Sequence, residues 1–170
     1  MSTDPALTLF PVGDADVVAT ADDCYTPRWV FDAMGLHFDL DAAAPIGGPL
    51  HVPCQRYYTA ADDGLSLPWD GITWCNPPYS NFGPWARKWA ESQQAALMGT
   101  YTPGTSWFPD VFGAADAVAF ITCEFLRPGL PAIRPMHGLF VAFRGLGTKP
   151  AARLAAADRF GAVLYGRGAA

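Results

Sequence analysis

Four consecutive residues, Asn76-Pro77-Pro78-Tyr79, carry the side chains best suited to chemistry, and they directly follow the apolar-rich residues 72–75. Two prolines cannot continue the hydrogen-bonded ladder of a central strand, so they end the strand and stiffen the backbone beyond it. The Asn76 side-chain oxygen and the Pro77 carbonyl oxygen then form two fixed acceptors beside the ring of Tyr79. Because ligands of open α/β sheets bind beyond the carboxyl ends of strands, we expect this motif to border a cleft.

Two such acceptors suit an exocyclic amine on a planar ring. Each oxygen can accept one N–H, which frees the nitrogen lone pair for attack and stabilises positive charge developing on nitrogen. Tyr79 would stack on the ring, a contact worth roughly 1–3 kcal/mol, and a duplex base would have to flip out to arrive there. The competing interpretation is a proline-stiffened strand exit with Tyr79 packed on the core, and the tetrapeptide alone leaves both open.

Cysteine and histidine suggest no second reactive centre. There is no CxxC pair, and neither residue type falls into ligand spacing: Cys24, Cys54, Cys75, Cys123, His37, His51, His137. Reduced thiols in a cytosolic protein, without disulfides and without a metal, are therefore expected.

Alternating strands and helices are expected to position the motif. The patterns predict strands near residues 36–41, 56–59, 71–75, 95–101, 117–122, 138–143 and 161–165. They predict helices near residues 26–34, 84–94, 107–114 and 151–157. In the first helix, Thr26 is a suitable N-cap, Pro27 suits the first helical position, and Gly35 suits the end. We expect an α/β fold with a mainly parallel sheet, in one domain of residues 23–170 after a loose arm of residues 1–22.

Charge is distributed unevenly along the 170 residues, of which 51% are hydrophobic. Residues 1–126 contain four basic and fifteen acidic side chains, whereas residues 127–170 contain seven basic and one acidic. A basic segment on an acidic body can face phosphates, or it can be ordinary solvated surface. The candidate DNA-binding residues within it are Arg127, Arg134, Arg144 and Lys149. No apolar run approaches the ~20 residues of a membrane span.

Several motifs together resemble those of a known family. They are the TP-containing residues 25–31, the first-strand residues 38–44, residues 57–69, the motif at 74–80 and residues 102–108. Their order and spacing resemble the small phage-type Dam-like DNA adenine-N6 methyltransferases, over roughly residues 24–145. The resemblance implies a compact Rossmann-like methyltransferase fold whose second half-unit is shortened, since only 35 positions separate Asp41 from Asn76.

The resemblance also implies S-adenosylmethionine as the methyl donor, without a metal, and direct in-line transfer to adenine in DNA. Asn76, Pro77, Pro78 and Tyr79 would be catalytic. The implied cofactor-binding residues are Tyr25, Thr26, Pro27, Asp41, Ala42, Ala43, Asp63 and Asn76. Thr26 and Pro27 would line the methionine end, Asp41 would lie near the ammonium, and Asp63 would lie near the adenosine.

Other acceptors and partners stay open at this point. Cytosine N4, an RNA adenine and a protein glutamine present the same planar NH2 group, and the basic segment favours nucleic acid. Alanines at 42–44, where many methyltransferases have glycine, leave room for a non-catalytic binding module. The chain is too short for a large recognition domain, so specificity would come from loops such as residues 125–137, from a homo-oligomer or from a partner subunit. A cytoplasmic location is expected.

Overall fold

A computed structural model describes residues 24–127 and 129–166, so the predicted arm of residues 1–22 lies outside the described part. The strands of its main sheet are β1 Phe38–Asp41, β2 Cys54–Tyr57, β3 Thr73–Cys75, β4 Ala95–Thr100, β5 Ala117–Ile121, β8 Leu139–Arg144 and β9 Ala162–Tyr165. Within the described residues they form a seven-stranded sheet in the order β2-β1-β3-β4-β8-β5-β9. A separate hairpin pairs β6 Phe125–Arg127 with β7 Leu130–Ile133.

The sheet is mainly parallel, as predicted. β2, β1, β3 and β4 pair in parallel, and β5 runs in the same direction because β8 is antiparallel to both β4 and β5. β9 closes the far edge antiparallel to β5. We call the end where β1, β3 and β4 finish the carboxyl edge, and the end where they begin the amino edge. The chain passes from β1 to β2 on one side and returns to β3 on the other, so the strand order reverses between β1 and β3. Ligands of α/β sheets bind at such a reversal.

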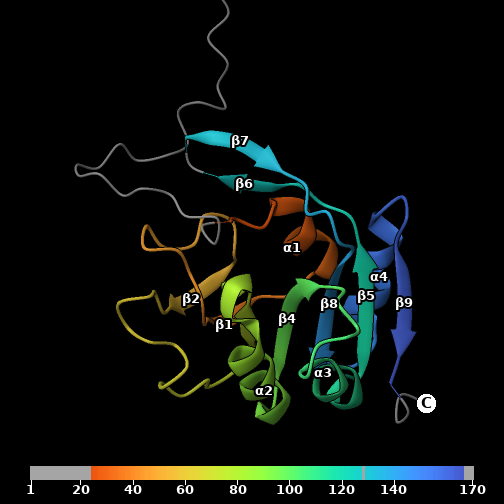
Figure 1. Cartoon of the computed structure of the whole chain (residues 1–170), viewed down its shortest axis with the longest axis horizontal. Helices are drawn as coiled ribbons and strands as arrows, with labels where there is room; N and C mark the ends of the chain where they lie inside the picture. The colour runs from red at the N-terminus through yellow and green to blue at the C-terminus, as the bar shows by residue number, and fades with distance from the viewer. Residues whose placement is uncertain (1–23, 128, 167–170) are drawn as a thin grey trace, which may run out of the picture.

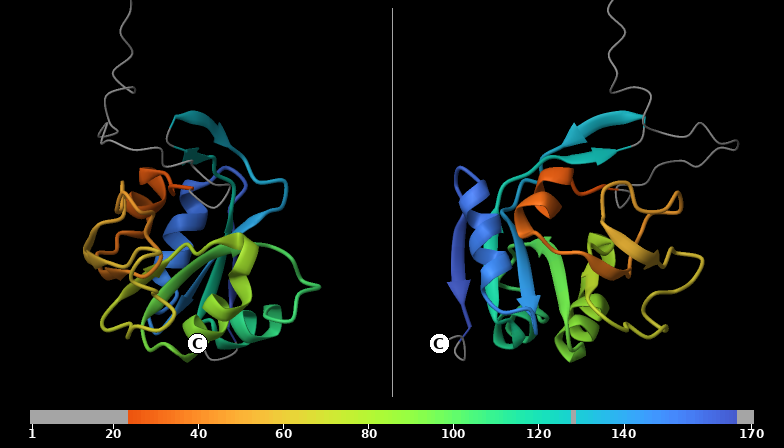
Figure 2. Two further views of the ribbon diagram at one scale, coloured as in Figure 1. Left: turned by 60° about the vertical axis from the view of Figure 1, so that its left-hand side comes forward. Right: turned by 180° about the vertical axis from the view of Figure 1, so that it is seen from behind.

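Helices cover both faces of the sheet (Figures 1 and 2). α1 (Arg28–Met34) and α4 (Lys149–Ala157) contribute to one hydrophobic cluster, and α2 (Phe82–Glu91) and α3 (Phe108–Ala114) contribute to the other. α2 shows why: its buried residues are Phe82, Trp85, Ala86 and Trp89, which share one side of a helix. The outcome is a three-layer arrangement that leaves the carboxyl edge of the strands accessible.

Two local differences from the predicted elements, and one agreement, matter for the site. α1 begins after Thr26, with Pro27 as its N-cap and no side-chain cap, so the predicted Thr26 cap is wrong; Gly35 ends the helix with φ 64°, as predicted. The interval between β1 and β3 contains only β2 and loops, as predicted. The hairpin of β6 and β7 occupies a stretch for which we expected only a proline-rich excursion.

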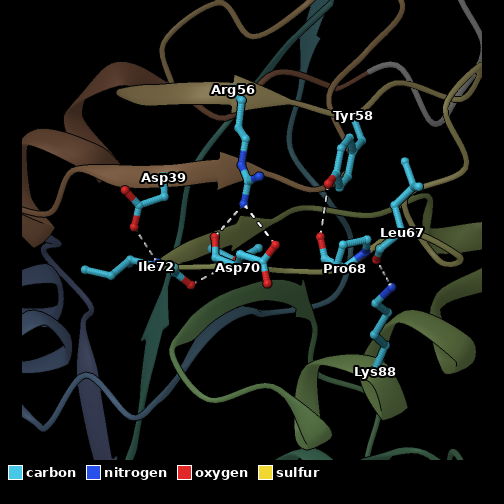
Figure 3. A network of polar contacts seen from close by, with 10 residues as sticks. Asp39, Arg56, Tyr58, Leu67, Pro68, Asp70, Ile72 and Lys88 are labelled. Atoms are coloured by element: carbon cyan, nitrogen blue, oxygen red, sulfur yellow. Dashed lines mark hydrogen bonds and ion pairs between the residues drawn. The ribbon is translucent and has the colours of Figure 1, made fainter.

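The long connection from β2 to β3 is held down by polar contacts (Figure 3). Arg56 Nη2 donates to the Asp70 carbonyl at 2.7 Å, and Tyr58 Oη donates to the Pro68 carbonyl at 3.0 Å. From α2, Lys88 Nζ donates to the carbonyls of Gly64 (3.1 Å), Leu65 (2.7 Å) and Leu67. This connection therefore has a fixed path although it contains no helix.

Candidate active site

A pocket lies where β1 and β3 end at the carboxyl edge. It has a cavity volume of ≈ 20 Å³ and is lined by Cys24, Tyr25, Thr26, Asp41, Ala43, Pro45, Pro49, Leu50, His51, Val52, Trp74 and Asn76. Five of the predicted cofactor-binding residues are thus brought together from three segments: Tyr25, Thr26, Asp41, Ala43 and Asn76. Asp41 and Trp74 are register partners on the neighbouring strands β1 and β3. The residues that follow them therefore leave the sheet side by side, which explains why these side chains lie together.

Asp41 is the acidic residue of the pocket, and burial disfavours the charged form of its carboxyl. Its side chain is 3% exposed, and the one hydrogen bond that the described residues give its carboxyl comes from the Ala43 N–H at 3.2 Å. Burial raises the pKa of Asp41 to about 7, and the Ala43 hydrogen bond opposes that rise only in part. A buried carboxylate with so little compensation favours a cationic ligand, which would restore the charged form.

The alanines that follow Asp41 are compatible with a tight turn. The Ala42 N–H donates to the Trp74 carbonyl at 2.9 Å, and the Ala44 N–H donates to the Tyr58 carbonyl at 2.8 Å. None of the three alanines has a positive φ, since Asp63 is the only described non-glycine residue that does. Glycine is therefore not needed here for backbone conformation.

Asn76 comes directly after β3, and its amide nitrogen is engaged by the segment before α1. Nδ2 donates to the Thr26 hydroxyl at 3.2 Å and lies 3.4 Å from the Cys24 carbonyl oxygen. Within the described residues no donor reaches Oδ1 of Asn76. The side chain therefore has its donors used by the protein and its acceptor available at the pocket.

The other motif residues continue away from the strand end. Pro77 is buried, Pro78 precedes the short 3-10 helix η2 (Tyr79–Asn81), and its carbonyl accepts from the Asn81 N–H at 3.2 Å. The ring of Tyr79 meets Phe82 and Phe125 edge-on, at centroid distances of 6.0 and 6.1 Å. Its hydroxyl is buried without a hydrogen-bond partner among the described residues, and burial raises its pKa well above the ordinary value. Tyr79 thus packs on the core, and the residue as a whole is half-buried.

Three predicted cofactor residues do not line the pocket. Pro27 is the N-cap of α1, and Ala42 is buried against Gly64. The two backbones are so close that a Cβ atom on residue 64 would lie 2.2 Å from the Ala42 carbonyl oxygen. Asp63 is exposed, has φ 57°, and accepts a hydrogen bond from the Ser66 hydroxyl at 2.5 Å. Its carboxylate stabilises a local turn, and its predicted contact with an adenosine stays a prediction.

The four basic candidates separate into two groups. Arg127 and Arg134 belong to the hairpin that rises from the carboxyl edge after β5 (Figure 1). Arg144 pairs in register with Ala95, the first residue of β4, and therefore lies at the amino edge. Its guanidinium donates to the carbonyls of Ser92 (2.6 Å) and Ala114 (3.0 Å). Lys149 follows as the first residue of α4. The structure thus does not gather these residues into one basic surface.

Sequence reasoning missed one wall of the pocket, formed by residues 45–52. Half-buried His51 belongs to it, and burial, followed by the nearby Arg28, lowers the pKa of His51. This wall is a Pro- and Gly-rich loop whose sequence lacks the hydrophobic periodicity of a helix or strand. Its position depends on contacts between distant residues, such as Gly47 next to the Tyr25 hydroxyl. No local signal in the sequence identifies it.

Some alternatives find no support in the described residues. No group of three or more His, Cys, Asp or Glu side chains there could hold a metal ion. No disulfide joins the four cysteines in the part of the chain that the structure describes. No described helix is both long and apolar enough to cross a membrane.

Comparison with known proteins agrees with the residues gathered at the pocket. A search of curated proteins gives no match. The family model described as DNA N-6-adenine-methyltransferase (Dam) matches residues 15–141, which is more than half of the chain and includes β1, Asn76 and the hairpin. The chain therefore belongs to the Dam family of DNA N-6-adenine-methyltransferases.

Proposed function

We propose that this chain transfers a methyl group from S-adenosylmethionine to the N6 amine of an adenine in DNA. One observation carries the proposal: the Asn76 amide has its nitrogen engaged by Thr26 and Cys24 and its oxygen available, next to the buried carboxylate of Asp41. An amine acceptor and a site for a cation thus lie at the same strand reversal.

The residues of the pocket fit a cationic cofactor. Asp41 would hold the ammonium group of S-adenosylmethionine, because a positive charge would compensate the carboxylate that burial disfavours. Tyr25, Thr26 and Ala43 would line the same ligand. The cavity of ≈ 20 Å³ is far smaller than the ~300–1,000 Å³ typical of ligand pockets, so its walls would have to move apart to admit the cofactor. When bound, S-adenosylmethionine supplies an electrophilic methyl group.

The side chains of the motif would then align and stabilise the attacking amine. Oδ1 of Asn76 and the Pro77 carbonyl oxygen would each accept one N–H of that amine. This favours the nitrogen geometry needed for in-line attack and stabilises the developing positive charge. No residue of the chain has to form a covalent intermediate. The Tyr79 ring would stack on the adenine after the base has flipped out of the duplex.

The hairpin of β6 and β7 is the proposed DNA-contacting element. All four residues of β7 are exposed, Leu130 and Ile133 are 47% and 39% exposed, and Met136 beyond them is 96% exposed. Its cationic side chains are Arg127, which donates to the Pro131 carbonyl at 3.0 and 3.1 Å, and Arg134, which pairs with Glu124 at 3.1 Å. An exposed two-stranded ribbon with cationic side chains can enter a DNA groove and contact phosphates. It would supply sequence specificity through these contacts.

The test uses purified protein, methyl-labelled S-adenosylmethionine and unmethylated duplex DNA, with the DNA digested to nucleosides and the labelled nucleoside identified by mass. Label on N6-methyldeoxyadenosine is the expected result, and Asn76→Ala protein from the same preparation controls for contaminating methyltransferases. Label on deoxycytidine would identify cytosine N4 as the acceptor, with the same mechanism of transfer. Absence of label despite cofactor binding would direct the assay to RNA and glutamine acceptors, and absence of binding would favour a non-catalytic module.

A further inference from the structure

Thr26 has a different role from the one its position before a helix suggests. A threonine there usually caps the helix, yet Pro27 is the N-cap of α1 and no side chain caps it. The Thr26 side chain is only 5% exposed, and its hydroxyl donates to the Met98 sulfur at 3.5 Å. The same hydroxyl accepts from Nδ2 of Asn76 at 3.2 Å. Thr26 therefore connects the catalytic motif to the core of β4.

The contacts around Asn76 determine which way its amide faces. The Cys24 carbonyl oxygen, 3.4 Å from the amide, can only accept, so the amide atom nearest to it must be the NH2 group. Thr26 has one hydroxyl proton, which it gives to Met98, so its lone pairs are directed at Asn76. A flipped amide would place oxygen against oxygen at Cys24. It would also leave the Thr26 hydroxyl with two acceptors competing for one proton.

We infer that Thr26 is a positioning residue that holds the Asn76 amide with Oδ1 toward the target amine. The inference rests on the proposed function, because it assumes that Asn76 accepts an N–H from the substrate. In the opposite orientation Asn76 would present NH2 to NH2, and two donors cannot bond. Correct orientation is thus a requirement for transfer and not for cofactor binding.

The segment that contains Thr26 is itself fixed from the other side. The Tyr25 N–H donates to the Leu126 carbonyl at 2.8 Å, and the Leu126 N–H donates to the Tyr25 carbonyl at 3.0 Å. This isolated antiparallel bridge connects residues 24–26 to the first strand of the hairpin. Thr26 is therefore a rigid reference point for Asn76, and a change of its side chain need not displace its backbone.

Thr26→Val and Thr26→Ser separate this role from a direct contact with the cofactor. Valine has nearly the shape of threonine but no acceptor, so kcat at saturating cofactor should fall by tenfold or more, toward the roughly hundredfold that misplaced catalytic groups can cost. The Kd for S-adenosylmethionine should change by less than about threefold, because valine keeps the apolar part of the side chain that would line the cofactor and loses only the hydroxyl that Asn76 and Met98 engage. Thr26→Ser keeps the acceptor and should restore kcat. Thr73→Val is the matched control, since Thr73 is also fully buried and its hydroxyl bonds only the Gly71 carbonyl.

A second readout does not depend on activity. The chain has only two asparagines, Asn76 and the exposed Asn81, so 15N-asparagine labelling gives two side-chain NH2 pairs in an NMR spectrum. The Asn76 pair should be protected from exchange with water in wild type and Thr26→Ser, and should shift and lose protection in Thr26→Val.

Each outcome bears on the inference. An unchanged Asn76 pair in Thr26→Val would overturn it, as would a raised Kd for cofactor with an undiminished kcat. Wild-type protein that methylates no adenine would remove the proposed function, while the NMR comparison would still decide whether Thr26 orients Asn76.

Discussion

Asp39 and Asp41 lie two positions apart on β1, yet the amino and carboxyl edges of the sheet treat their carboxylates differently. Toward the amino edge, Asp39 accepts from the Ile72 N–H at 2.8 Å (Figure 3), and it also accepts from Gln55 Nε2 at 3.2 Å. At the carboxyl edge, Asp41 is almost completely buried, and within residues 24–127 and 129–166 its carboxyl accepts only from the Ala43 N–H. The first carboxylate is satisfied by the protein. The Asp41 carboxylate has too few hydrogen-bond donors for a buried charged group, which costs folding stability. Such a group is typical of sites where a ligand supplies the missing partner.

The amide and cationic side chains show the same contrast. Arg144 at the amino edge and Lys88 on α2 use their donors on backbone carbonyls that hold loops in place. Asn76 at the carboxyl edge uses its donors in the same way but leaves its acceptor available. Asp41 and Asn76, both at the carboxyl edge, therefore keep hydrogen-bond acceptors that the described residues leave unused. This distinguishes the two site residues from the structural contacts of Arg144 and Lys88.

The largest expected effect is that of Asn76→Ala. Removing the acceptor should lower methyl transfer by at least the roughly 10²–10³-fold seen when one charge-stabilising group is removed. The Kd for S-adenosylmethionine should stay nearly unchanged, because Asp41 remains. Labelled transfer and calorimetric titration measure the two quantities on the same sample. Retained turnover would show that the available Oδ1 is not the catalytic acceptor.

Asp41→Asn and Asp39→Asn test the contrast on β1 directly. Asp41→Asn should weaken cofactor binding by tenfold to hundredfold, about 1.5–3 kcal/mol, because it removes a charged partner. Asp39→Asn should leave the Kd unchanged and lower the free energy of unfolding, because Ile72 and Gln55 share that carboxylate. Equal effects of both substitutions on cofactor affinity would remove the distinction between the two carboxylates.

The pH dependence of stability sharpens the same comparison. The pKa of Asp41 rises from 3.8 to about 7 on folding, so the folded state binds a proton that the unfolded state has released. The stabilisation is present below about pH 4 and is lost as the pH rises through 7. Asp41→Asn should therefore match wild type near pH 3.5 and become progressively more stable than wild type as the pH rises, by roughly 2–4 kcal/mol at pH 8. Denaturant unfolding without cofactor at both pH values measures the difference.

The basic residues of the two edges should differ in their effect on DNA binding. Arg134→Gln in the hairpin should weaken binding a few-fold and reduce the slope of log K against log salt by about 1, as loss of one phosphate contact does. Lys149→Gln removes one exposed charge near the amino edge and should leave the slope unchanged. Salt titrations of duplex binding give both slopes. An equal change in Lys149→Gln would extend the DNA interface to the amino edge.

Local signals in the sequence predicted most of the fold. The spacing of Phe82, Trp85 and Trp89 marks α2, Gly35 marks the end of α1, and the prolines after Cys75 mark the strand end that carries Asn76. The hairpin was missed because β7 is exposed along its whole length and therefore lacks the alternation that a half-buried strand shows.

The parts of the site that depend on distant contacts could not be predicted from the sequence. Thr26 has the residue type and position of a helix cap, and only its contact with Asn76, 50 positions away, reveals another role. Asp41 and Asp63 have the same chemistry, and their difference arises from burial: Asp41 is enclosed between strands, whereas Asp63 lies on an exposed turn. Side-chain direction likewise depends on packing partners that sequence spacing does not specify.

Tyr79→Phe should have the smallest effect, and it tests the direction in which one side chain, that of Tyr79, is packed. The hydroxyl is buried without a partner among the described residues, so its removal should raise the free energy of unfolding by up to about 1 kcal/mol. The ring remains, and because stacking uses the ring face, transfer should stay within about threefold of wild type. Tyr79→Ala is the control, since it removes the ring and should slow transfer strongly. If Tyr79→Phe instead loses activity at unchanged stability, the hydroxyl must find a partner during the reaction, and the inward packing against Phe125 would be only the ligand-free position of the ring.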